Sequence, residues 1–144
     1  MPGSARPRGF TFVTFLILLA ASAGIFWVVT YGPAYWDNYE VKQILAQAAN
    51  LAYSEPLDKK VHDFIYRRLH EKFDVEVQKP GGKMGKELVI DAPEENLRME
   101  RSKTPDRIDI WFTYSRDVRQ PLTGVVRTVT FYHHAEQDLS QTKW

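Results

Sequence analysis

Residues 10–31 have the sequence FTFVTFLILLAASAGIFWVVTY, which contains no charged side chain. At about 1.5 Å of rise per residue, a helix of this length covers the roughly 30 Å hydrocarbon core of a bilayer. Arg6 and Arg8 precede the stretch, whereas Asp37 and Glu40 follow it. Because basic flanks stay in the cytoplasm, we expect a membrane anchor with its amino terminus inside and the rest of the chain outside.

A cleaved export signal also begins with basic residues and an apolar run. The apolar run here is longer than the roughly 7 to 15 residues of a signal-peptide core, and no small-x-small cleavage site stands at its end. We therefore expect a basic cytoplasmic leader over residues 1–9 and a retained transmembrane anchor over 10–36. For a bacterial source, this places the protein in the inner membrane with a periplasmic domain.

Composition narrows the classes of partner and of site. The 144-residue chain has a formal net charge of +1 and no cysteine. A nucleic-acid partner is not expected, because phosphates are bound by an excess of Lys and Arg. Without cysteine there are no disulfides or thiolate metal sites, so the extracytoplasmic domain, residues 37–137, must be held by its own core. We expect residues 138–144 to form a frayed tail.

Two groups of residues within the anchor indicate contacts. Ala20 and Gly24 have the small-xxx-small spacing that lets two membrane helices approach closely, although such pairs also occur in spans that face only lipid. Aromatic rings settle at the depth of the lipid headgroups. Four of them crowd the far end of the anchor and are predicted to mark the outer interface: Trp27, Tyr31, Tyr35 and Trp36.

The helical pattern resumes directly after Gly32-Pro33, a pair that normally breaks a helix. Apolar residues then recur at three- and four-residue spacing up to Ala52. We therefore expect one long helix, kinked near Pro33, whose second half faces the domain core. A second, amphipathic helix is predicted after Ser54 as its N-cap, with an apolar face that packs on a sheet.

After Phe73 the apolar pattern changes from helical to alternating. Strand-like segments lie around 73–78, 87–91, 97–101, 107–115 and 125–134, and the glycine-rich stretch 79–86 reads as a hairpin turn. Because the segments follow one another through short turns, we expect one small antiparallel sheet of about four strands, backed by the helices. The predicted fold class is α+β.

The start of the chain resembles the amino-terminal segment of type IV pilins and pseudopilins. The resemblance rests on RGFT at residues 8–11 and on GPAYWDNY at residues 32–39. It implies that a peptidase cleaves between Gly9 and Phe10 and that the exposed helix packs in a filament. Pilins usually carry Glu at the fifth mature position, where this chain has Thr14, so the carboxylate that pairs with a neighbouring subunit's terminal amine is missing.

Taken as a whole, the chain resembles the bacterial membrane family called domain of unknown function 4845. The resemblance covers nearly all of residues 8–137 and includes RQPLTGVV at 119–126 and FYHH at 131–134. It implies a single-pass envelope protein with a pilin-like start and without an established activity.

The four histidines are the obvious candidates for metal binding or acid–base chemistry. His133 and His134 are neighbours in an expected strand, so one side chain points to the core and the other to solvent. His62 and His70 lie two turns apart on the second helix without a motif such as H-E-x-x-H. We therefore expect no cofactor, no metal site and no enzymatic activity.

Trp111 is predicted to lie on the face of its strand that points away from the apolar residues. An exposed tryptophan often marks a contact surface. The alternative is that the second helix covers this side chain.

Three functions are compatible with these features, in order of preference. The first is a structural or accessory subunit of an envelope assembly, in contact with membrane lipid and with other envelope proteins. The second is a pseudopilin-like subunit, cleaved before Phe10, of a type IV pilus or a type II secretion-like system. The most remote is a metal-dependent hydrolase, suggested only by the histidines.

Overall fold

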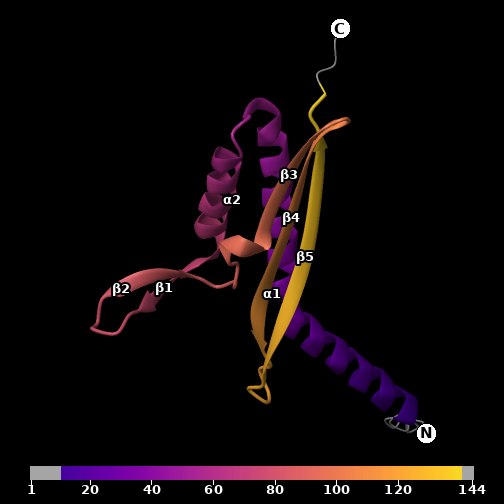
Figure 1. Cartoon of the computed structure of the whole chain (residues 1–144). Coiled ribbons are helices and arrows are strands. Elements are labelled where there is room, and N and C mark those ends of the chain that lie inside the picture. The colour runs from indigo at the N-terminus through magenta and orange to yellow at the C-terminus, as the bar shows by residue number, and fades with distance from the viewer. Residues whose placement is uncertain (1–10, 141–144) are drawn as a thin grey trace, which may run out of the picture.

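The computed structural model describes residues 11–140 and has an α+β architecture in which two helices precede all the strands (Figure 1). The elements in chain order are α1 (Phe12–Ser54), α2 (Asp58–Phe73), β1 (Asp74–Gln78), β2 (Met84–Leu88), the short 3-10 helix η1 (Glu94–Asn96), β3 (Leu97–Lys103), β4 (Asp106–Arg119) and β5 (Val126–Asp138).

Helix α1 is continuous even though Pro33 lies in its middle, which confirms the predicted single long helix. Proline lacks the N–H that would bond to the carbonyl four residues earlier, and its ring crowds that carbonyl, so helices bend at such positions. In Figure 1 the indigo first half and the purple second half of α1 run in different directions.

The two halves of α1 lie in different surroundings. From Phe12 to Val29 every residue except the half-buried Phe26 is exposed. Burial begins at Thr30 and then follows a stripe at helical spacing, as expected for a helix with one face on a core. The buried apolar residues of this stripe are Ala34, Val41, Ile44, Leu45, Ala48, Ala49 and Ala52.

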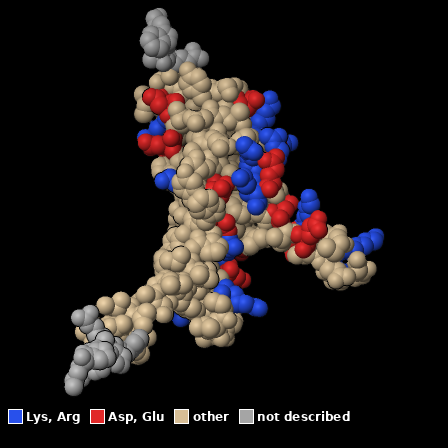
Figure 2. Space-filling view, turned by 180° about the vertical axis from the view of Figure 1, so that it is seen from behind, with Lys and Arg blue, Asp and Glu red and all other residues tan. Residues whose placement is uncertain are grey.

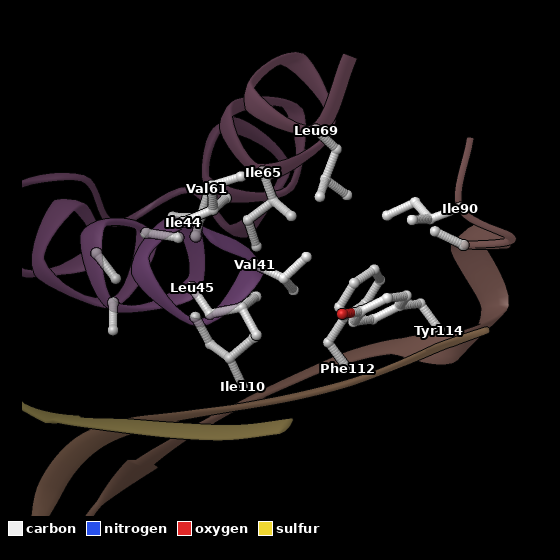
Figure 3. Packing of buried hydrophobic residues seen from close by; sticks show 14 of the residues in the cluster. Val41, Ile44, Leu45, Val61, Ile65, Leu69, Ile90, Ile110, Phe112 and Tyr114 are labelled. Atoms are coloured by element: carbon white, nitrogen blue, oxygen red, sulfur yellow. The ribbon is translucent and has the colours of Figure 1, made fainter. Parts of the chain in front are cut away.

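Helix α2 folds back on α1 and buries Val61, Ile65 and Leu69 completely. The prediction that this helix packs on the sheet is corrected, because α1 lies between α2 and the three-stranded sheet (Figure 3). The predicted cap is also wrong. Ser54 is the last residue of α1 and donates its hydroxyl to the Leu51 carbonyl oxygen at 3.1 Å.

The connection between the two helices is held by Arg101 of β3, which the sequence pattern did not single out. Its guanidinium donates to the carbonyl oxygens of Ala52 at 3.2 Å and Glu55 at 2.8 Å, and its Nε pairs with the Asp58 carboxylate at 2.6 Å. The last carbonyls of a helix have no partner within the helix. Arg101 therefore satisfies the end of α1 and fixes the start of α2.

Five strands form two antiparallel sheets, where one sheet of about four strands was expected. Strands β1 and β2 form a hairpin of their own, with Gly81 and Gly82 at positive φ in its turn. Strands β3, β4 and β5 form the second sheet. Strand β5 continues to Asp138, beyond the predicted strand end, so part of the predicted tail is paired with β4.

The core lies between the sheet and α1 and continues from α1 to α2 (Figure 3). Alternate residues of β4 form the sheet side of this core, which explains why apolar and polar residues alternate along the strand in the sequence. The fully buried residues on this side are Ile108, Ile110, Phe112 and Tyr114.

We expect Leu45→Ala to lower the free energy of unfolding by about 2–5 kcal/mol, because it leaves a cavity between α1 and Ile110 in a core where Leu45 is only 1% exposed. The matched control is Leu122→Ala, since Leu122 is 84% exposed. The measurement is denaturant unfolding of the full chain in detergent micelles, followed by near-UV circular dichroism. Equal unfolding midpoints for the two variants would contradict the described core.

Candidate membrane anchor and contact surfaces

The first half of α1 is long and apolar enough to span a membrane, and its most apolar window is not buried anywhere in the structure. Core helices of soluble proteins meet the same length and composition criteria but are mostly buried. Large apolar side chains point outward along this whole half, from Phe12 at 74% exposure to Val29 at 61%. The arrangement is compatible with a single membrane anchor.

Three of the four predicted interface aromatics form one connected group. The Trp27 ring lies 5.7 Å from that of Tyr31 and 5.8 Å from that of Tyr35. Tyr35 in turn meets Phe131 of β5 edge to face at 5.8 Å. Trp36 points elsewhere and lies 6.1 Å from Tyr39. The aromatic group therefore joins the anchor to the sheet, and its position at a membrane interface stays a prediction.

Ala20 and Gly24 are both exposed on the anchor. A Cβ placed on Gly24 would meet no atom within 4 Å, so the space beside this pair is open to a neighbouring helix. Helix packing at this point stays a prediction. The predicted cleavage residues Gly9 and Phe10 lie outside the described residues.

A polar junction holds α1 to the sheet just beyond the aromatic group. Asp37 of α1 pairs with the Arg116 guanidinium of β4. At the next residue of α1, the side-chain oxygen of Asn38 accepts from the Tyr114 hydroxyl at 3.4 Å. Burial lowers the pKa of Arg116 and raises that of Tyr114. An unpaired charge that is shielded from water raises the free energy of the folded state. The carboxylate of Asp37 therefore stabilises the buried end of the Arg116 side chain.

His133 lies on the same inner face, as predicted for one of the two adjacent histidines. Its ring is parallel to the Tyr114 ring at 5.9 Å, and its Nε2 atom is buried without a hydrogen-bond partner among the described residues. Burial, and then the positive charge of Lys42 on α1, lower the pKa of His133. The neutral imidazole is therefore the form that the fold favours.

His134 points to the opposite face and stacks on Trp111 at 5.0 Å, with 6° between the rings. The Arg98 guanidinium lies over the Trp111 ring at 5.2 Å. Trp111 is thus half-buried on the outer face of the sheet, and the alternative that α2 covers it is wrong, because the helices lie on the other face. Arg98 and His134 cover part of the Trp111 side chain, and the rest of its ring faces outward.

Next to Trp111, the carboxylate of Asp109 accepts from His134 Nε2 at 2.8 Å and forms an ion pair with Arg107, whose Nε atom lies 3.0 Å from it. Glu136 lies opposite Asp109 in the β4–β5 register. Ligand atoms of Asp109, His134 and Glu136 lie within 4.8 Å of one another, so the three residues form a group of metal-ligating type. The sequence analysis missed this group because only the register joins the residues. The Arg107 guanidinium already balances the Asp109 charge.

The β1–β2 hairpin projects from the body of the domain (Figure 1). It is tied at its base, where Val89 N donates to the Phe73 carbonyl oxygen at 2.9 Å. Val75 and Met84 on the hairpin are 43% and 64% exposed. The sequence placed these strands in the main sheet because their alternation resembles that of any half-buried strand.

Comparisons with protein-family models, with curated proteins and with solved structures found no match to this chain.

We expect the domain to lose stability as the pH falls below 6.5, the ordinary pKa of histidine, because the unfolded chain then binds a proton at His133 that the folded chain refuses. The stabilisation is complete above that value and declines until the lowered pKa of the folded state is reached. Between about pH 7 and about pH 5, the melting temperature of His133→Gln should therefore fall less than that of the wild-type chain.

His62→Gln is the matched control for this measurement, since His62 lies on α2, away from the face of His133. Melting is followed by tryptophan fluorescence of the full chain in detergent micelles. If His133→Gln keeps the wild-type pH slope, the buried neutral histidine is not a source of acid sensitivity.

Proposed function

We propose that the protein is a single-pass, membrane-anchored envelope protein that serves as a structural or accessory subunit of a membrane assembly. The observation that carries this proposal is the continuity of α1, whose exposed apolar half passes directly into the buried half that organises the domain core. A loose tether would not need such continuity. A helix shared by anchor and core fixes the domain close to the bilayer.

The orientation follows from the charges that flank the anchor. Arg6 and Arg8 precede it, and Asp37 and Glu40 follow it, so the amino terminus is cytoplasmic and the domain extracytoplasmic. The resemblance to the bacterial family of unknown function supports the inner membrane and the periplasm as the two compartments.

Contacts with other proteins are supported by the projecting β1–β2 hairpin. An isolated two-stranded hairpin is only marginally stable in water, and its outer edges carry unpaired backbone groups that can pair with another chain. Its exposed Val75 and Met84 add apolar area that a partner would bury. The half-exposed Trp111, on the outer face of the sheet, is the second surface of this kind.

A photo-crosslinking amino acid at Met84 tests the proposal in intact cells. We expect one or a few discrete crosslinked products with envelope proteins, identified by mass spectrometry, because the hairpin is the most projecting part of the domain. The matched control is the same amino acid at Lys103, an exposed site at the end of β3. Gln78→Asp, which lies opposite Met84 in the β1–β2 register and on the same face of the hairpin, should weaken the products at Met84.

A chain that forms no specific product from Met84 or from Trp111, and that purifies from mild detergent as a lone monomer, would overturn the accessory-subunit proposal.

A pseudopilin-like subunit is the second candidate function, favoured by the open space beside Ala20 and Gly24 on the exposed helix. Under this alternative, a peptidase removes the residues before Phe10. Under the first proposal, we expect the intact mass of protein extracted from its native membrane to retain Arg6 and Arg8. A mass that corresponds to a chain beginning at Phe10 would favour the pseudopilin.

A further inference from the structure

The turn between β4 and β5 presents large apolar side chains to solvent. Leu122 is 84% exposed, and Val125 and Val126 are 49% and 48% exposed. No element within residues 11–140 covers them. Exposed apolar groups of this size at the tip of a hairpin are expected to be covered by a partner or by lipid.

Hydrogen bonds within the turn fix its backbone, and this backbone holds the apolar side chains outward. Gln120 N donates to the Val125 carbonyl oxygen at 2.9 Å, and Gly124 N donates to the Gln120 carbonyl oxygen at 2.9 Å. Gly124 has a φ of 68°, which a residue with a side chain rarely adopts. The polar groups of the turn also bond to each other, since the Thr123 hydroxyl donates to Gln120 Oε1 at 2.9 Å. The polar groups are satisfied inside the turn, and the apolar ones remain outside.

The turn lies at the end of the domain where the anchor leaves it (Figure 1). Phe131 of β5 is level with Tyr35 of α1, because their rings are in contact at 5.8 Å. From Phe131 to Val126 the strand extends by about 17 Å. The tip therefore lies about 17 Å beyond the level of Tyr35, on the side of the domain from which the anchor leaves.

Arg119 and Arg127 flank the apolar tip, and both are exposed. Neither side chain makes an ion pair within the described part of the chain. The lowest part of the domain beside the anchor is uncharged in Figure 2, with basic side chains directly above it. The apolar tip and the two arginines above it match two layers of a membrane. The tip corresponds to the acyl chains, and the arginines correspond to the phosphates that lie closer to the water.

We propose that residues 120–126 form a second membrane contact, which rests on the anchoring proposed above. Leu122, Val125 and Val126 enter the boundary between headgroups and acyl chains, and Arg119 and Arg127 bind lipid phosphates. The bilayer then holds the domain at two points, the anchor and the β4–β5 tip, and stops it from swinging about the bend at Pro33. Anionic phospholipid is the lipid class that this surface fits.

The cysteine-free chain allows a direct test by single-site labelling. The full chain is reconstituted into vesicles of phosphatidylglycerol and phosphatidylethanolamine, with an environment-sensitive fluorophore at Leu122→Cys. A quencher on the lipid headgroup should quench this label strongly. The matched control is Lys103→Cys, which is exposed at the end of β3 opposite to the tip, where it pairs with Asp106, and which should be quenched little. A third label at Ile17→Cys reports the anchor itself, through a quencher on the acyl chain.

Quenching at Ile17 without quenching at Leu122 would leave the anchor in place and overturn the second contact. Quenching at neither site would overturn the anchor, and the second contact with it. A Leu122 label that is shielded from water but untouched by lipid quenchers would assign the tip to a second copy of the chain, which also overturns the proposal.

The two arginines are tested by the double variant Arg119→Gln/Arg127→Gln in the labelled chain. Each arginine near an anionic surface increases membrane partitioning by about fivefold. In vesicles that contain anionic lipid, the double variant should therefore show clearly less quenching at Leu122 than its parent. In vesicles of phosphatidylcholine alone, the double variant and its parent should differ little. The control Lys83→Gln/Lys103→Gln removes the same charge elsewhere and should keep the quenching. Equal losses in the two variants would contradict binding of phosphates by Arg119 and Arg127.

Discussion

One helical backbone has to suit two surroundings in this protein, and the rest of the structure depends on that constraint. Up to Val29 the side chains of α1 are uncharged, mostly apolar and, except for the half-buried Phe26, exposed, which is compatible with a helix in lipid. From Thr30 onward burial follows one stripe of mainly apolar residues. The change occurs within one turn of Pro33, where the helix is free to change direction without ending. The anchor and the core are therefore parts of one element.

The sheet is attached to this helix mainly through its inner face. Apolar residues of β4 pack on α1, and polar contacts at both ends of the packed region fix the position of the sheet along the helix. Near the anchor, Asp37 pairs with Arg116. At the far end, Arg101 binds the last carbonyls of α1 and the first turn of α2. Because both arginines extend from the sheet to the helices, sliding of one layer on the other would leave partly buried charges unpaired.

Under the proposed anchoring, proximity to the bilayer gives a common reason for the placement of the exposed features. The aromatic group of Trp27, Tyr31 and Tyr35 and the tip of the β4–β5 hairpin lie at the anchor end of the domain. The β1–β2 hairpin projects from the side, where a neighbouring protein in the same membrane would meet it (Figure 1). A subunit held at a fixed height and tilt presents such an arm to its partners at a low cost in orientational entropy.

The sequence by itself determined the long helix, the amphipathic second helix, most strand positions and the opposite directions of His133 and His134, because local periodicity encodes them. It did not determine how the strands divide into two sheets, that α1 lies between α2 and the sheet, or that β5 continues to Asp138. Those features depend on contacts between distant residues, such as Arg101 with the α1–α2 connection and Asp109 with His134, for which local periodicity carries no signal. Only the tertiary structure decided them.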